Sequence, residues 1–296
     1  MFNKGLGERA EFYHYHPTIN IFYFVIVITM TMFSTSPVFL ATSIIGAWTY
    51  SILLKGKAVI KNNMIITLFT LVMMSIINAI FTHTGETVLF YFNHNRITLE
   101  AFFYGLGSAL MLSAVVIWFS AFNVIISSDK LIYLFGKIMP VIGLTLSMIL
   151  RFIPLLKNRF SQIRQGQNAM GRGEQRGIIN KSRLLSKEVS ILIAWSLESS
   201  IESSDSMEAR GYGLPGRTSF NLFKITQRDI VLFVTMVILA AIMFVGVSLN
   251  KTTMYYFPKI TFEKVDLTTM ITLAAYTIVI FTPIVIDILG EKRWEK

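Results

Sequence analysis

The sequence predicts an all-α, polytopic helical membrane protein with about six transmembrane spans and a long cytoplasmic segment between the fourth and fifth spans. Hydrophobic residues make up 53% of the 296-residue chain and charged residues only 15%, whereas about a quarter of the residues in a soluble domain are charged. The mean hydropathy is +0.59. Five or six apolar runs approach or exceed the ~20 residues that cross a bilayer as a helix.

The first four spans are predicted in the N-terminal part of the chain. A polar segment, residues 1–17, precedes them and does not have the layout of a cleaved signal peptide. The four apolar runs are Thr18–Phe33, Val38–Leu54, Met64–Phe81 and Leu99–Ile126. Ser and Pro in the STSP sequence between the first two runs mark a turn. A polar, aromatic loop, Thr82–Arg96, separates the third run from the fourth.

The chain changes character after residue 126. Apolar stretches alternate with charged residues from 127 to 228, which favours cytoplasmic or interfacial helices over ordinary spans. Two further apolar runs follow at about Ile230–Leu249 and Leu267–Leu289. The predicted parts are a cytoplasmic N-terminus, spans one to four, the coupling-helix segment, and spans five and six with a cytoplasmic tail, over residues 1–17, 18–126, 127–228 and 229–296.

The distribution of Lys and Arg predicts the orientation in the membrane. If six spans alternate strictly, 23 of the 27 Lys and Arg residues lie on one side and four on the other. Because cytoplasmic loops carry an excess of basic residues, the richer side is predicted to be the cytoplasm. Both termini are therefore expected there, in a multi-pass protein of the cell membrane. The basic excess is explained by contact with the bilayer and cytoplasm, without a nucleic-acid partner.

Residues that would support an independent pump or an enzyme are scarce. The interiors of the first, second, third and fifth spans contain no Asp, Glu, Lys, Arg or His, although ion-coupled transporters usually bind their ion on such residues. The chain has no GxxxxGK nucleotide loop and no Cys. Its four His residues are divided between the two membrane faces in the predicted topology. We expect no catalytic residue, no metal site and no cofactor in this chain.

The fourth span carries a face of small residues. Ala101, Gly105, Ala109 and Ser113 recur every four residues. In lipid, small residues at this spacing let another helix approach closely, and this packing drives association. The face is therefore either an ordinary helix contact within the chain or a docking face for a separate membrane subunit, and the sequence leaves both interpretations open.

The segment from 127 to 228 predicts helices that leave apolar surface for packing. Pro140, and Arg151 with Pro154, argue against a clean span, so one or two helices are expected near the interface. A later helix is expected at about Ser182–Arg210. Its apolar stripe consists of Leu185, Val189, Ile193, Leu197 and Ile201. Because these residues are spaced four apart, they share one helix face, and the helix is expected to pack on something.

Both of these helical stretches end in a similar way. The first closes with Ala169, Met170, Gly171, Arg172 and Gly173, and the second with Ala209, Arg210 and Gly211. Gly is an ordinary helix stop, and a cation in the last turn suits the helix dipole. Two such ends in a protein without its own energy source favour a further role, the docking of a partner protein. A guanidinium at a helix end can form two parallel hydrogen bonds with a carboxylate in a partner's groove.

These motifs resemble those of a known family. RFIP at Arg151–Pro154 and MEARGYG at Met207–Gly213 are the most specific parts of a similarity that covers about residues 14 to 250. The chain resembles the transmembrane T component (EcfT or CbiQ-like) of energy-coupling factor (ECF) transporters, which are ABC importers.

The resemblance implies the partners and the mechanism. The two Arg-containing helix ends would dock into two cytosolic ABC ATPases, which bind ATP and Mg. A small membrane S component would bind a vitamin or a transition-metal ion, and ATP hydrolysis would topple it to release the cargo inside. The motif at 209–211 matches the family pattern, whereas Met170 stands where Arg is usual and Arg172 is the nearest Arg. His16-Pro17-Thr18 and the sixth span also depart from the usual pattern.

Three other interpretations remain at the level of sequence. A stand-alone secondary transporter is disfavoured by the lack of ionisable residues within the spans. A membrane-embedded enzyme would need a cluster of Asp, Glu or His, and the acidic cluster Glu198, Glu202, Asp205 and Glu208 has no His beside it. The membrane permease subunit of another ABC importer would use a binding protein in place of an S component.

Overall fold

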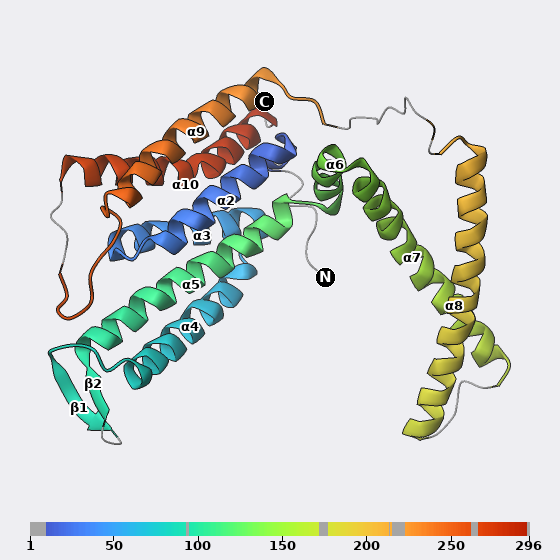
Figure 1. Cartoon of the computed structure of the whole chain (residues 1–296), viewed down its shortest axis with the longest axis horizontal. Coiled ribbons are helices and arrows are strands. Elements are labelled where there is room, and N and C mark those ends of the chain that lie inside the picture. The colour runs from blue at the N-terminus through green and yellow to red at the C-terminus, as the bar shows by residue number, and fades with distance from the viewer. Residues whose placement is uncertain are drawn as a thin grey trace. The chain divides into compact units, whose positions relative to one another are not determined.

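The computed structural model describes residues 10–92, 95–171, 177–212, 214, 223–261 and 266–294. These residues are mostly helical (Figure 1). The elements are η1 (Glu11–His14), α2 (Pro17–Phe33), α3 (Pro37–Lys55), α4 (Val59–Phe81), β1 (Val88–Phe92), β2 (Asn95–Thr98), α5 (Leu99–Ile125), α6 (Ser128–Ile138), α7 (Pro140–Ala169), α8 (Ile178–Ala209), α9 (Gln227–Ser248) and α10 (Leu267–Trp294). The all-α fold class is confirmed. The antiparallel hairpin β1–β2 replaces part of the predicted loop.

The chain divides into two compact units. The bundle unit consists of residues 1–130 and 223–296, and the hairpin unit consists of residues 131–222. In the bundle unit, α5 contacts α2, α3 and α4, while α10 contacts α3 and α9. The hairpin unit is built from α7 and α8, which pack against each other. Residues far apart in sequence therefore share the bundle, because the chain leaves it once and returns.

Six helices are long and apolar enough to cross a membrane, which confirms the predicted number. The set gains one helix that was not predicted as a span and loses one that was. Residues Val141–Ala169 of α7 meet the criterion, whereas α2 has 17 residues and is shorter. Pro154 stays inside α7. The break between α6 and α7 falls at Pro140, which occupies the first turn of α7, where its missing N–H costs no hydrogen bond.

An aromatic cluster forms the centre of the bundle unit. Trp118 on α5 is fully buried, and its ring centroid lies 6.1 Å from Tyr23, 6.4 Å from Phe24 and 6.2 Å from Tyr50. The indole Nε1 of Trp118 donates a hydrogen bond to Ser43 Oγ at 3.2 Å. The helices α2, α3 and α5 therefore share one core, and its buried indole N–H has the partner that it needs.

The last helix, α10, belongs to the same core. A Cβ atom added to Gly46 on α3 would lie 2.0 Å from Ile280 Cγ2, so these two helices touch at a point where only glycine fits. Thr31 on α2 is 2.9 Å from the hydroxyl of Tyr276, and Tyr23 donates to the carbonyl of Ile280 at 3.2 Å. The sixth predicted span is thus an integral helix of the bundle.

Candidate functional site

The two helices of the hairpin unit run antiparallel. Arg164 on α7 forms an ion pair with Glu188 on α8, with 3.5 Å between Nε and Oε2. The guanidinium carbon of Arg159 lies 5.0 Å from the ring centroid of Trp195. Residue numbers rise along α7 while those of their partners on α8 fall, so the chain directions are opposed. Figure 1 shows the two helices crossing, α7 in green and α8 from yellow to orange.

This arrangement places the two predicted motifs at opposite ends of the hairpin unit. The first motif follows the C-terminal end of α7, on the side where α8 begins. The second follows the C-terminal end of α8. At 1.5 Å per residue, Arg210 lies roughly 33 Å along α8 from the crossing at Glu188. The structure does not bring the two motifs together into one site.

The second motif closes α8 with a fixed backbone geometry. Gly211 has a φ of 78°, and its N–H donates to the carbonyl of Glu208 at 2.9 Å. The N–H of Tyr212 donates to the carbonyl of Met207 at 3.0 Å. These two bonds are the pair that defines a Schellman motif, in which the residue with positive φ is usually glycine. The helix therefore ends at a defined point.

Arg210 lies at that end and is exposed. It is the half-helical cap residue of α8, and its own N–H donates to the carbonyls of Ser206 and Met207. Among the residues that the structure describes, no carboxylate is paired with its guanidinium. The backbone is thus satisfied internally, while the charged side chain is available to a carboxylate from outside the chain.

The first motif has half of the same geometry. α7 ends at Ala169, and Met170 is its cap residue with an exposed side chain. Gly171 has a φ of 74°, and its N–H donates to the carbonyl of Asn168 at 2.9 Å. Arg172 and Gly173 lie outside the described residues. That Arg172 takes over the role of the usual Arg at position 170 stays a prediction.

The small-residue face of the fourth span is filled from within the chain. Ala101, Ala109 and Ser113 are fully buried. A Cβ atom added to Gly105 would lie 2.8 Å from the Cα of Ser75 on α4. Of the two interpretations that the sequence left open, the contact within the chain describes this face. At Gly105 the neighbour is α4, and docking of a separate membrane subunit on this face stays a prediction.

The predicted apolar stripe of α8 is exposed. The exposed fraction of its five residues ranges from 38% for Val189 to 65% for Ile201. The acidic residues Glu198, Glu202, Asp205 and Glu208 are also exposed. The long amphipathic helix therefore presents an apolar and an acidic surface that the described part of the chain leaves uncovered.

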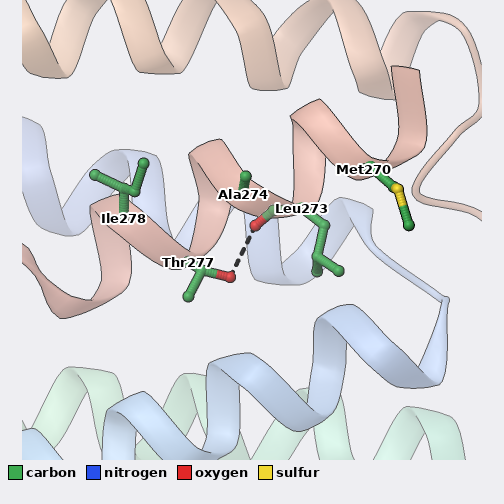
Figure 2. Close-up of a pocket in the computed structure, with 5 residues that line it drawn as sticks. All are labelled: Met270, Leu273, Ala274, Thr277 and Ile278. Atoms are coloured by element: carbon green, nitrogen blue, oxygen red, sulfur yellow. Dashed lines mark hydrogen bonds between the residues drawn. The ribbon is translucent and has the colours of Figure 1, made fainter. Parts of the chain in front are cut away.

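A shallow apolar groove of about 450 Å³ lies along α10 (Figure 2). Its lining consists of Met270, Leu273, Ala274, Thr277 and Ile278. The Thr277 hydroxyl donates to the carbonyl of Leu273 at 2.8 Å, so the polar group of the lining is already used. Among the described residues, no group of three or more His, Asp or Glu side chains could hold a metal ion. The groove suits a lipid chain better than a polar cargo.

Sequence reasoning missed one polar cluster, at the N-terminal end of the bundle unit. Lys130 is buried there. Among the described residues, no carboxylate lies within ion-pair distance of its amine, which donates instead to two backbone carbonyls. Every residue type has a backbone carbonyl, so the partners of Lys130 cannot be recognised from the sequence. Lys130 was instead counted with the other basic residues of the 127–228 segment.

A mostly helical chain with six span-length apolar helices, one of which, α7, forms a separate unit with α8, has the architecture of a multi-pass membrane protein. The comparison with known families agrees. The chain belongs to the CbiQ family of cobalt transport proteins, which matches residues 13–220.

A curated relative supports the same assignment. The energy-coupling factor transporter transmembrane protein EcfT of Lactobacillus helveticus (strain DPC 4571) is 28% identical over 106 residues. The match covers 35% of this chain and 38% of that protein. The resemblance to the transmembrane component of ECF transporters is therefore confirmed at the level of the family.

Proposed function

We propose that the chain is the non-catalytic transmembrane coupling subunit of an ECF-type ABC importer. Two cytosolic ABC ATPases bind ATP and Mg, and this chain passes their motion to a small membrane S component. The S component carries a vitamin or a transition-metal ion. Both termini lie on the cytoplasmic side, and residues 127–228 lie on that side or at its interface with the membrane, as the Lys and Arg distribution indicates.

The observation that carries the proposal is the second helix end of the hairpin unit. Arg210 projects from a helix that Gly211 stops with a Schellman geometry, and no described carboxylate of the chain pairs with it. The first helix end lies on the other side of the crossing with the same glycine conformation. Two separated docking ends suit two ATPase subunits better than one.

The groove of the bundle unit bears on where a cargo would bind. The groove along α10 is apolar. A charged cargo needs polar or charged partners when it leaves water. In this proposal the S component supplies them, and the exposed surface of the hairpin unit is available for partner subunits.

The test is an affinity purification of the tagged chain from its native membranes, with co-purifying proteins identified by mass spectrometry. We expect two ABC ATPases and a small hydrophobic protein. Truncating one partner of a buried charge pair costs about 2–5 kcal/mol, or about 30-fold or more in affinity. Arg210→Ala should therefore lose most of the ATPase signal, and an Arg172→Ala/Arg210→Ala double variant should lose more.

Arg183→Ala is the matched control, because Arg183 is an exposed arginine on the same helix, away from its end. Equal ATPase recovery with Arg183→Ala and Arg210→Ala would reject the docking role. Purification without any ATPase, together with uptake by the chain alone in liposomes, would favour a stand-alone secondary transporter. ATPases recovered with a periplasmic or lipid-anchored binding protein would favour a permease subunit of another ABC importer.

A further inference from the structure

The N-terminal residues 10–17 form a compact segment, here called the clip, that packs on the end of α10. The Phe12 side chain is fully buried, and its N–H donates to the Asp287 carboxylate at 2.7 Å. A Cβ atom added to Gly290 would lie 2.0 Å from Cγ of Glu11. The clip is thus held against the last helix by a buried side chain, a charge-assisted hydrogen bond and a close backbone approach.

Lys130, in the first turn of α6, is held by the same clip. It is 2% exposed, and its Nζ donates to the carbonyls of Tyr13 and Ile125. The Nζ atom also lies 3.8 Å from the Tyr13 ring centroid, which is close enough for a cation–π contact. With its amide oxygen turned toward Lys130, Asn20 accepts from Nζ at 2.9 Å and donates to the carbonyl of Phe12.

These contacts replace water around a buried amine. Among the described residues, no carboxylate lies within ion-pair distance of Lys130. Burial accordingly lowers the pKa of Lys130 to about 8. A buried lysine that is held only by carbonyls, an amide and a ring carries a desolvation cost, so its place in the fold calls for a reason beyond the stability of the bundle.

The start of α9 is tied to the clip as well. The N–H of His16 donates to Asp229 Oδ1 at 3.3 Å. The other carboxylate oxygen, Oδ2, accepts from the N–H of Thr226 at 2.8 Å and from its hydroxyl at 2.7 Å. Thr226 and Asp229 form a capping box that fixes the first turn of α9. One carboxylate therefore joins this turn to the clip.

The two tied points are the two places where the chain passes between its units. Lys130 is the last residue of the bundle unit before residue 131, and the bundle unit resumes at residue 223, just before Thr226. We propose that Lys130 is a positioning residue that, through the clip, holds two points of the bundle unit together: the residue that precedes the hairpin unit and the first turn of α9, which follows it. Motion that the hairpin unit applies to these two points is then passed to the spans through the clip and α10.

This inference rests on the proposed function, because it needs an ATP-driven motion of the hairpin unit. The test uses the co-purified complex in lipid nanodiscs and follows backbone hydrogen exchange by mass spectrometry, with and without ATP and Mg. The variant is Lys130→Met, which keeps the length of the side chain and removes its donors. Lys137→Met is the matched control, because Lys137 is an exposed lysine on the same helix.

In the wild-type complex we expect ATP to change exchange in both units. In Lys130→Met we expect exchange of residues 11–16 to rise at least tenfold. The ATP response of the hairpin unit should remain, while the response of the bundle helices should fall at least fivefold. Lys130→Arg, which keeps the charge and the donors, should restore the response of the bundle helices to ATP. If Lys130 only stabilised the fold, its substitution would not change the effect of ATP on hydrogen exchange in these helices.

Two results would overturn the inference: unchanged exchange in the clip of Lys130→Met, or a loosened clip with a normal ATP response in the bundle. If Lys130→Met does not accumulate in the membrane, Tyr13→Ala is judged by the same criteria, since it removes the ring over Lys130 and keeps the backbone carbonyl to which Lys130 donates. If neither variant accumulates, Lys130 serves folding and the positioning role is rejected. Absence of ATPases from the wild-type complex would instead reject the proposed function.

Discussion

At the scale of single residues, Gly211 fixes the end of α8 at which Arg210, the proposed docking residue, is located. Its φ of 78° lies in the left-handed region, where an L side chain is strained. Any change of backbone there alters the direction in which the arginine leaves α8. The sequence predicted a helix stop at this glycine, and the pair of hydrogen bonds around it shows how the stop is built.

We expect Gly211→Ala to weaken ATPase co-purification although Arg210 is retained. A left-handed alanine costs about 1–2 kcal/mol, and the added Cβ would also meet Leu214 Cδ1 at 3.0 Å. The helix end should rearrange, with a loss of roughly five- to thirty-fold in affinity, because 1.4 kcal/mol is about tenfold. The measurement is the amount of ATPase recovered per tagged chain.

Gly166→Ala is the control for this substitution. Gly166 lies within α7, and a Cβ atom added there would meet no atom within 4 Å. Alanine is favoured over glycine in a helix interior by about 1 kcal/mol. The control should therefore retain the partners. Retention of normal ATPase recovery by Gly211→Ala would mean that the geometry of the helix end is unimportant for docking.

At the scale of elements, apolar runs predicted the helices of the bundle unit to within a few residues. They failed where the deciding contacts are not local. The loop predicted at Thr82–Arg96 contains β1 and the start of β2, because VLFYF, which is rich in strand-forming residues, pairs antiparallel with Asn95–Thr98. In the hairpin unit, α6 and α7 confirm the one or two helices expected before residue 171, and Pro154 lies inside α7.

The small-residue face of α5 shows the limit of pattern reasoning for the candidate site. Four small residues in register indicate a close helix contact, and the structure contains one. The partner could not be read from the pattern, since packing in lipid favours a neighbour in the same chain and a separate subunit alike. The motifs at 169–173 and 209–211 were recognised because glycine and arginine mark a helix end locally.

We expect Gly105→Ala to destabilise the contact between α5 and α4. The added Cβ would lie 2.8 Å from Ser75 Cα and 2.9 Å from the carbonyl oxygen of Met74, which are backbone atoms that cannot rotate away. Overpacking costs typically 1–3 kcal/mol, which exceeds the ~1 kcal/mol that alanine gains in helix propensity. The melting temperature of the protein in detergent should therefore fall.

Gly107→Ala on the same helix is the comparison. Its added Cβ would meet the hydroxyl of Tyr256 at 2.8 Å, and moving this side-chain end costs the hydrogen bond that it donates to the carbonyl of Thr35, about 1 kcal/mol. The melting temperature of this variant should therefore fall less than that of Gly105→Ala. Equal stability of both variants would show that α4 and α5 do not approach as closely as described.

At the scale of the whole molecule, the match to the CbiQ family ends at residue 220, yet the helices beyond it complete the bundle. α10 reaches the core through Tyr276 and Ile280 and the clip through Asp287. The sequence suggested an additional span, and hydropathy could not tell whether it was central or peripheral. Its centrality comes from contacts between residues that are more than 200 positions apart.

The meeting point of Gly46 and Ile280 tests whether α10 is part of the cooperative core. Gly46→Ala should destabilise the protein, because its Cβ would lie 2.0 Å from Ile280 Cγ2. Ile280→Ala alone should cost about 2–5 kcal/mol through loss of buried volume. The double variant should be no less stable than Ile280→Ala, since the new methyl group enters the space that the isoleucine leaves. Such non-additivity is expected only for residues in contact. Thermal melting in detergent gives the melting temperatures of the wild type, the two single variants and the double variant.

If each single variant melts like the wild type, α10 is a peripheral anchor, and the clip that it supports cannot hold Lys130 and the first turn of α9 together.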